Sequence, residues 1–173
     1  HFYPKSFLSG TDGSLAKLIE IPIGGSKKPF DLETIHTVSD PFEQGHCLHM
    51  DGRAMFKEVV PFIADTLIPE LLKRNEQHIH DIGTIIFHQA NGRMIDAVSH
   101  RLKERGFNGC VPMNISHYAN TTSASIPLLF YEAVAAGFIT RNMWVILASF
   151  GGGLSWSAVL MNTRNFPPEY EGK

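Results

Sequence analysis

The feature of this sequence that most restricts its fold is the alternation of short apolar runs with segments of helical periodicity. Thr84–Phe87 is an apolar run of the buried-strand type, and the stretch after it keeps one apolar helical face up to Gly106. The same order recurs in the strand-like stretch Val111–Ile115 and in a helix from about Ser125 to Ala136. Strands that alternate with helices predict an α/β domain, in which helices cover a mixed or parallel sheet.

The last part of the chain predicts two adjacent strands, at residues 143–149 and 154–161. The glycines of 151–153 separate them, and in the second strand apolar residues alternate with smaller or polar ones. Neighbouring strands joined by so short a loop imply an antiparallel pair, so we expect the sheet to be mixed.

The first part of the chain shows one strand pattern, at residues 14–23, which the glycines after it close. Residues 24–49 have no clear period and predict a long surface excursion. We therefore divide the chain into residues 1–49, which hold this first strand and the excursion, and a main domain at residues 50–173.

An apolar stripe of helical periodicity begins at Gly52 and contains Pro61 and Pro69. Because each proline lacks an N–H donor and its ring crowds the preceding turn, we expect a kink or a break at these positions. Asn91 is a suitable cap for the next predicted helix.

The composition fits one globular domain with a core of its own. Of the 173 residues, 43% are hydrophobic and 18% are charged, and the net charge of -2 gives no electrostatic case for nucleic acid or an anionic membrane. No apolar run approaches the ~20 residues needed to span a bilayer, and the N-terminus lacks the pattern of a signal peptide. We therefore expect a soluble, cytoplasmic protein. Because the chain begins at His1 without an initiator Met, we also expect it to be a piece of a larger protein.

Three segments lie where α/β folds place their chemistry, at the carboxyl ends of strands; they contain His88, Asn120 and the glycines of 151–153. A His and an Asn at strand ends can direct N–H groups at one oxygen, which would stabilise an oxyanion or an enolate. The glycines let the backbone approach a ligand closely. Taken singly, each segment has a plainer interpretation: a structural hydrogen bond for the histidine, a helix cap for the asparagine and a turn for the glycines.

Taken together, the segments resemble one family. HQANGRMIDA, YANTTSASIP and SFGGGLSWSAVLM are similar, in the same order, to the segments HQAN-x-R-I, GNTSAASVP and FGGGFTWGSAL of the β-ketoacyl-[acyl-carrier-protein] synthase III family. Further upstream, HMDGRAMFKEVV is similar to the family's M-x-G-x-x-V-F-K helix start, so that the resemblance covers residues 8–162. It implies the C-terminal half of a thiolase-like fold, an α/β structure with a mixed sheet covered by helices.

The resemblance implies a condensing enzyme. In the family, a Cys of the N-terminal half takes an acyl group from acyl-CoA, and a His and an Asn bind the thioester carbonyl of malonyl-acyl-carrier protein. Decarboxylation then gives an enolate that attacks the acyl-cysteine. Carried over by motif, His88 and Asn120 are the two catalytic donors, with the histidine neutral, and the backbone N–H of Gly152 joins the oxyanion hole for the acyl group.

By the same motifs, five residues are implied in binding the phosphopantetheine arm of the substrates. Ala90 and Asn91 match residues that contact the arm, and Met50, Gly52 and Phe56 match its apolar wall. No bound cofactor and no metal are expected, because acyl-CoA and malonyl-acyl-carrier protein are substrates.

Lys57, Arg93 and Arg101 are implied to form a basic patch for the acidic acyl carrier protein, with a solvated helix face as an equal alternative. The other implied partners are the protein's own N-terminal half, or a partner subunit that supplies it, and a second copy in a homodimer.

The sequence also departs from the family pattern. The Gly that commonly precedes the catalytic Asn is Ala119 here, which is acceptable at negative φ and awkward at positive φ. Thr122 and Ser123 stand in place of the family's Ser-Ala, which is a mild change. Neither Cys47 nor Cys110 lies in a context like that of the family's nucleophile, so the chain alone is expected to be inactive.

The remaining cysteine and histidine patterns predict no further site. Two cysteines do not make a disulfide framework and fit a reducing compartment. His46, Cys47 and His49 fit no four-ligand metal pattern. His78 and His80 are interpreted as an exposed loop pair.

Three functions stay open. The first is the C-terminal part of an acyltransferase that performs decarboxylative condensation at the start of fatty-acid or polyketide synthesis. The second is a non-catalytic domain that docks carrier protein or supports a heterodimer. The third is a thiolase-superfamily acyltransferase that forms esters or amides, with the histidine as general base. Intact His88 and Asn120 favour the first function over the second, because a structural partner has no chemical need for both.

Overall fold

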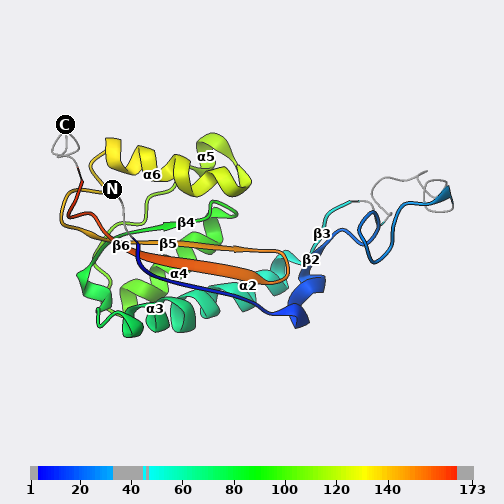
Figure 1. The fold of residues 1–173 in the computed structure, drawn as a ribbon, viewed down its shortest axis with the longest axis horizontal. Coiled ribbons are helices and arrows are strands. Elements are labelled where there is room, and N and C mark those ends of the chain that lie inside the picture. Colours follow the sequence, from blue (N-terminus) through cyan, green and yellow to red (C-terminus); the bar gives the residue numbers. More distant parts are fainter. Residues whose placement is uncertain (1–3, 33–44, 46, 167–173) are drawn as a thin grey trace.

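A computed structural model describes residues 4–32, 45 and 47–166. Its centre is a four-stranded sheet in the order β1-β6-β5-β4 (Figure 1). The strands are β1 (Pro4–Thr11), β4 (Ile82–Phe87), β5 (Trp144–Gly151) and β6 (Ser155–Asn162). β4 and β5 are parallel, whereas β6 is antiparallel to both β5 and β1, so the expected mixed sheet and C-terminal hairpin are confirmed.

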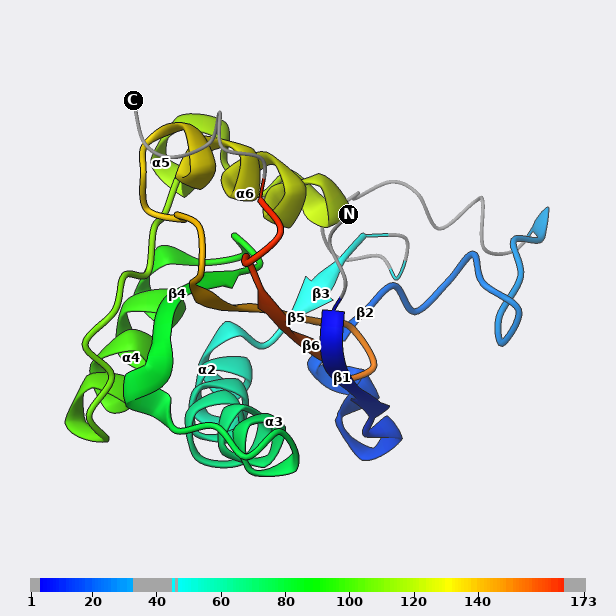
Figure 2. The same ribbon diagram turned by 60° about the vertical axis from the view of Figure 1, so that its left-hand side comes forward.

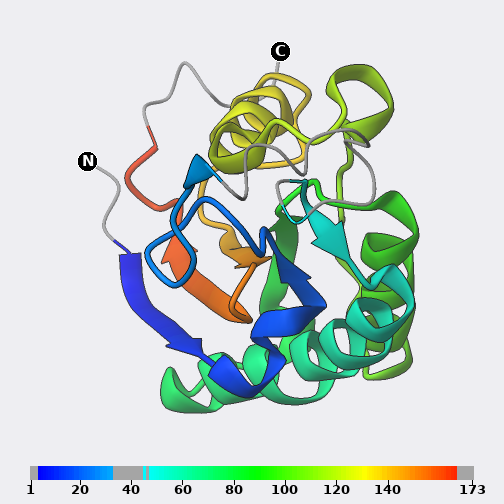
Figure 3. The same ribbon diagram turned by 90° about the vertical axis from the view of Figure 1, so that its right-hand side faces the viewer.

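Helices cover both faces of this sheet (Figure 2). One face packs against α2 (Gly52–Pro61), α3 (Ile68–Arg74) and α4 (Gly92–Glu104), and the other lies under α5 (Ile115–Tyr118) and α6 (Ser125–Ala135). Figure 3 shows the sheet edge-on between these two helix layers. Each layer has its own apolar core: Leu71 and Val98 belong to the first, and Leu129 and Val145 to the second. The expected α/β architecture is therefore confirmed.

The two prolines in the first long helix do not break it. A π-helical segment, η2 (Phe62–Leu67), follows Pro61 and ends just before Pro69, and the N–H of Ile68 bonds to Ile63 O, five residues back. A proline supplies no N–H and its ring crowds the carbonyl four residues earlier. The wider π turn accommodates both effects, so the predicted kink takes the form of a π segment inside a continuous helix.

The strand predicted at residues 14–23 is wrong in most of its length. Gly13–Leu18 forms a 3₁₀-helix, η1, which Asp12 caps by accepting the N–H of Ser14, and only β2 (Ile19–Glu20) pairs, with β3 (His49–Met50). The cap at Asp12 favours a helical turn over the strand that the apolar residues suggest, and Leu15 and Leu18 still pack against the core from this short helix. The strand that enters the sheet is the preceding one, β1.

The predicted surface excursion is exposed over residues 24–32 and runs away from the sheet there (Figure 1), whereas residues 45 and 47 are partly buried and His49 belongs to β3. Residues 33–44 and 46 of that prediction lie outside the described residues. Because β1 pairs with β6 along its length, the first described residues belong to the same sheet as the last strand. The division of the chain after residue 49 stays a prediction.

The strand predicted at Val111–Ile115 is also wrong. Only a single bridge forms there, between Cys110 and Thr84, and the chain then turns into α5. Pro112 is the second residue of the predicted strand and has no N–H to donate to a neighbouring strand, which explains the difference.

Candidate active site

His88 follows the end of β4, and its side chain is half-buried. Its backbone N–H donates to Ala148 O on β5 at 2.9 Å, and its ring and that of Phe150 form a T-shaped pair with 6.0 Å between centroids. Its Nδ1 atom lies 2.6 Å from the hydroxyl oxygen of Ser125, and its Nε2 atom has no hydrogen bond within the described part of the chain. Burial lowers the pKa of His88 below its ordinary value, which favours the neutral ring.

Asn120 lies between α5 and the short 3₁₀-helix η4 (Thr122–Ala124). The backbone N–H of Thr122 donates to its Oδ1 atom at 2.9 Å. Because a backbone N–H can only donate, the atom facing Thr122 is the amide oxygen. The Nδ2 group therefore points the other way, and among the described residues it has no hydrogen bond. The helix-cap and donor interpretations of Asn120 apply to different atoms of one amide.

The loop that presents Asn120 has a strained backbone. Ala119 has φ +55° and ψ −156°, and Thr122 has φ +53°. The conformation of Ala119 belongs to a region that glycine adopts and side chains with a Cβ avoid. The sequence left open whether Ala119 has a negative φ, which suits alanine, or a positive φ, which strains it. The structure gives the positive φ, and strain of this kind clusters at functional sites.

His88 and Asn120 line one open cavity of about 260 Å³. The other lining residues are Thr122, Ser123, Ser149 and Phe150. The structure thus brings together residues that follow β4, precede α6 and end β5. The imidazole Nε2 of His88 and the amide Nδ2 of Asn120 have no hydrogen-bond partner among the described residues, and as N–H donors they would suit an oxygen that becomes negative during a reaction.

A buried hydrogen-bond network braces the two loops of the cavity, and the sequence alone did not reveal it. The side chain of Gln89 donates to Phe87 O at 2.9 Å and accepts the N–H of Asn114 at 3.1 Å. The Asn114 amide donates to Glu132 on α6 at 2.7 Å. Hydrogen bonds from Asn114 and Tyr118 lower the pKa of Glu132, so the acceptor stays ionised. The only signal in the sequence was a set of polar residues between apolar elements.

Residues 72–163 match the family model for the C-terminal region of 3-oxoacyl-[acyl-carrier-protein (ACP)] synthase III. This chain belongs to that family. The β-ketoacyl-[acyl-carrier-protein] synthase III of Natranaerobius thermophilus is 38% identical to it over 159 residues, and that of Nitratidesulfovibrio vulgaris (strain Miyazaki F) is 37% identical over 158 residues. Each match covers 90% of this chain, and the chain spans only 45% and 44% of those relatives.

Solved structures of the synthase III family have the same fold. A 3-oxoacyl-(acyl-carrier-protein) synthase III matches 91% of this chain with a TM-score of 0.77 at 26% identity, and 47% of that protein is covered. The enzyme of Thermus thermophilus matches 93% of this chain with a TM-score of 0.73 at 34% identity, and 46% of it is covered. The expected family and thiolase-like fold are thereby confirmed.

The residues that the synthase III motifs implied in phosphopantetheine binding lie outside the lining of this cavity. Met50 and Phe56, at 59% and 38% exposure, lie on β3 and α2, beside the exposed Gly52. Ala90 is partly buried before α4, and Asn91 caps that helix by accepting the N–H groups of two residues in its first turn, as predicted.

Gly152 likewise lies outside the cavity lining, in the turn between β5 and β6. The turn passes close to the short β2 strand, so that a Cβ atom on Gly152 would come within 3.3 Å of the Ile19 side chain. This close approach gives a steric reason for a glycine there.

The three residues of the predicted basic patch have different surroundings. Lys57 on α2 and Arg93 on α4 are exposed. Arg101 pairs with Asp65 at 2.5 Å, and Arg105 reaches the other oxygen of the same carboxylate at 2.8 Å. One carboxylate thus already partly compensates the charge of Arg101.

Neither cysteine lies at the cavity. Neither Cys47 nor Cys110 is among its lining residues, and burial raises the pKa of the Cys110 thiol, which makes it a poorer nucleophile. Among the described residues, no group of three His, Cys, Asp or Glu side chains is placed to hold a metal ion. None of the helices in the described ranges has the length and apolar content to cross a membrane.

Proposed function

We propose that this chain is the part of a condensing enzyme that activates malonyl-acyl-carrier protein for decarboxylative Claisen condensation with an acyl primer. The observation that supports this most is the pair of neutral N–H donors, on His88 and Asn120, at one cavity. Membership of the synthase III family supports it independently.

In the proposed reaction, the thioester carbonyl of the malonyl group accepts hydrogen bonds from His88 and Asn120. When the bond to the malonyl carboxylate breaks, CO₂ leaves and the electron pair becomes an enolate. Its negative charge develops on the oxygen that the two donors hold, so they stabilise the transition state more than the ground state. The enolate carbon then attacks the acyl group on a cysteine, and the cysteine thiolate leaves. The backbone N–H of Gly152 is proposed to join the oxyanion hole for that acyl group.

The acyl-accepting cysteine is proposed to come from the N-terminal half of the same protein or from a partner subunit. The chain spans only 45% of its relative from Natranaerobius thermophilus, and neither Cys47 nor Cys110 lines the cavity. The complete protein, rather than this chain alone, is therefore proposed to be the active acyltransferase.

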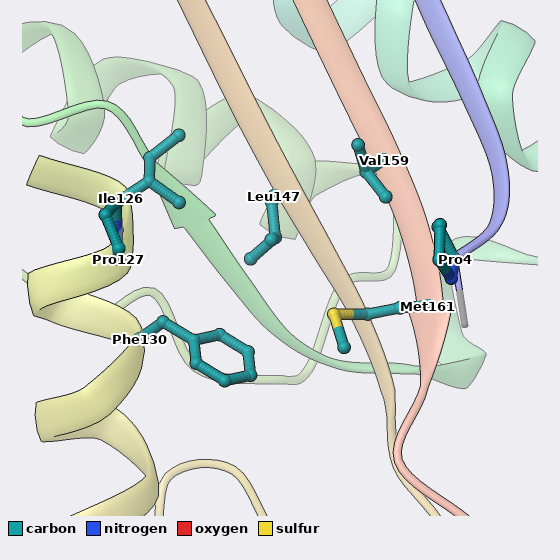
Figure 4. Close-up of a pocket in the computed structure, with 7 residues that line it drawn as sticks. All are labelled: Pro4, Ile126, Pro127, Phe130, Leu147, Val159 and Met161. Carbon is teal, nitrogen blue, oxygen red and sulfur yellow. The ribbon is translucent and has the colours of Figure 1, made fainter. Parts of the chain in front are cut away.

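An apolar hollow suits the packing of that other half. Between α6 and the sheet lies a space of about 350 Å³, and the side chains facing it in Figure 4 are apolar. They are Pro4, Ile126, Pro127, Phe130, Leu147, Val159 and Met161. Nearby on β1 and α6, Phe7 and Tyr131 are 68% and 72% exposed. An apolar surface of this kind is typical of a face that another part of a protein covers.

The substrates and partners follow from the same proposal. Acyl-CoA and malonyl-acyl-carrier protein are proposed to enter past Met50, Gly52, Phe56, Ala90 and Asn91, and no bound cofactor is required. For the acidic carrier protein, Lys57, Arg93 and Arg101 form the proposed docking patch, with Lys57 and Arg93 contributing most because Arg101 is already paired. The enzyme is proposed to be a cytoplasmic homodimer.

The proposed pathway is the initiation of fatty-acid synthesis, which agrees with the names of the related synthases. A priming β-ketosynthase from the R1128 polyketide pathway, at 25% identity and a TM-score of 0.70, keeps polyketide initiation as the alternative.

The test is CO₂ release from malonyl-acyl-carrier protein by the complete protein. His88→Ala and Asn120→Ala should each lower kcat by about 10²–10³, the usual effect of removing one oxyanion donor. His80→Ala and Asn108→Ala, which remove the same groups from exposed positions away from the cavity, should leave kcat unchanged. Unchanged CO₂ release in the first pair would refute the mechanism. Acyl transfer to an alcohol or amine without CO₂ release would instead identify an ester- or amide-forming enzyme.

A further inference from the structure

We infer that Ser125 is a positioning residue that holds the proton of the neutral His88 ring on Nε2, the nitrogen that faces the cavity. This inference deepens the proposed function, because its catalytic consequence rests on His88 acting as a donor. The position of the proton itself depends only on the hydrogen bonds around Ser125.

The hydroxyl of Ser125 is almost fully buried, with 1% of the residue exposed at the first position of α6. Its oxygen lies 3.3 Å from the backbone N–H of Gln89 and 2.6 Å from His88 Nδ1. The N–H of Gln89 can only donate, so it occupies a lone pair of the hydroxyl oxygen. Within the described residues these are the only hydrogen-bond partners of the Ser125 hydroxyl.

These two contacts decide which ring nitrogen holds the proton. The Ser125 hydroxyl hydrogen needs an acceptor, and the lone pair of His88 Nδ1 is the acceptor within reach. The other tautomer would direct two N–H donors at one hydroxyl oxygen and leave the hydroxyl hydrogen buried without an acceptor, which is unfavourable. The order of donation is therefore Gln89 N–H to Ser125 Oγ, and Ser125 O–H to His88 Nδ1.

None of the described residues that line the cavity has a charged side chain that competes with this arrangement. Of the ionisable groups on the neighbouring helices, Glu132 on α6 is bonded to Asn114, and Tyr118 on α5 is hydrogen-bonded to Glu132. His117 on α5 and Tyr131 on α6 are exposed and do not line the cavity. The ring of His88 thus meets one hydroxyl on Nδ1 and the open cavity on Nε2.

The tautomer decides what His88 offers to a substrate. With the proton on Nε2, the ring donates to a carbonyl or enolate oxygen. With the proton on Nδ1, the ring would direct a lone pair at the same oxygen and repel it. Ser125 therefore acts on the reaction through His88 and needs no contact with the substrate.

The direct test is the proton position in the complete protein with ¹⁵N-labelled histidine. In the parent protein, the ¹⁵N chemical shifts and ring couplings of His88 should show Nε2 protonated and Nδ1 unprotonated. Ser125→Ala should give a mixture of tautomers, because one buried hydrogen bond biases such an equilibrium by about tenfold. Ser125→Thr, which keeps the hydroxyl, should restore the parent pattern.

Ser123→Ala is the matched control, because it removes a hydroxyl from the same cavity that has no hydrogen bond to His88 within the described residues. The ring shifts should not change in this variant. If Ser125→Ala does not fold, Ser125→Cys keeps the size of the side chain with a weak donor, and it should shift the tautomers in the same direction. An unchanged His88 pattern in Ser125→Ala or Ser125→Cys would overturn the inference.

A kinetic measurement separates this inference from the proposed function. Ser125→Ala should lower kcat for CO₂ release by about tenfold with little change in KM for acyl-CoA, and the lower limb of its pH profile should move to higher pH, because the neutral ring loses a hydrogen bond. A changed tautomer with unchanged CO₂ release would support the proton assignment and refute the donor role of His88. An unchanged tautomer with lower activity would overturn the assignment alone.

Discussion

Replacing Ala119 by glycine tests whether the loop that presents Asn120 stores strain. Ala119 has φ +55° and ψ −156°, a backbone conformation that costs a residue with a Cβ about 1–3 kcal/mol. Glycine relieves this cost but loses about 0.5–1 kcal/mol through the greater freedom of the unfolded chain. The difference predicts that Ala119→Gly stabilises the fold by about 1 kcal/mol.

The assay is equilibrium unfolding in denaturant, where Ala119→Gly should raise the midpoint without changing the slope m. In a thermal scan, about 1 kcal/mol corresponds to a rise in Tm of about 2–4 °C for a chain of this size. Ala97→Gly, inside α4, is the control, and it should destabilise by about 1 kcal/mol because the same change is made in an ordinary helix. If both variants lose similar stability, Ala119 is not strained and the reasoning is wrong.

Two further predictions concern the ends of β4 and α4. Asn91→Ala should destabilise the fold by about 1 kcal/mol in denaturant unfolding, because it removes the side chain that accepts two N–H groups at the start of α4; an unchanged midpoint would show that water replaces the cap. For His88, burial places the folded pKa below the unfolded value of 6.5. Above pH 6.5 the ring is neutral in both states and contributes no pH dependence. As the pH falls from 6.5 toward the folded pKa, the unfolded state takes up the proton first, so stability should fall in that window and level off below it. His88→Gln should remove this component from the pH dependence of the unfolding free energy, and an identical profile in both proteins would contradict it.

The sequence predicted the main strands of the sheet and the placement of His88 and Asn120 at one site. Both predictions depend on short stretches of sequence, namely apolar runs and the polar residues that follow them. Apolar runs gave β4, β5 and β6, and Asn91 and Gly106 gave the two ends of α4. Once those strands are parallel and antiparallel in the observed order, the loop after β4 and the loop before α6 meet at one edge.

The errors lie where partners distant in the sequence decide the structure. β1 (Pro4–Thr11) contains proline, glycine and serines, and it forms a strand because it pairs with β6 at the other end of the chain. The apolar stretch after Asp12 predicts a strand, but the Asp12 side chain caps it as the 3₁₀-helix η1. Pro112 ends a strand pattern that its apolar neighbours suggest.

The polar residues that support the site were missed for a related reason. A buried Gln89 or Ser125 has no sequence period, and its role appears only when its hydrogen-bond partner is known. The same holds for Ala119, whose φ could not be predicted from the sequence. Motifs therefore identified the groups that face the cavity, whereas the groups that orient them required the structure.

One helix connects all of these features. Ser125 and Glu132 are seven residues apart on α6, close to two turns, so they lie on one face, where they hold the loop of His88 directly and through Asn114. Ile126 and Phe130 point to the other side of α6 and form a wall of the apolar hollow (Figure 4). Any part of the protein that fills this hollow packs against α6, the helix whose Ser125 contacts His88. In the proposed reaction, a half of the protein that packs into this hollow would do more than supply the cysteine, because by fixing α6 it would also fix the orientation of His88.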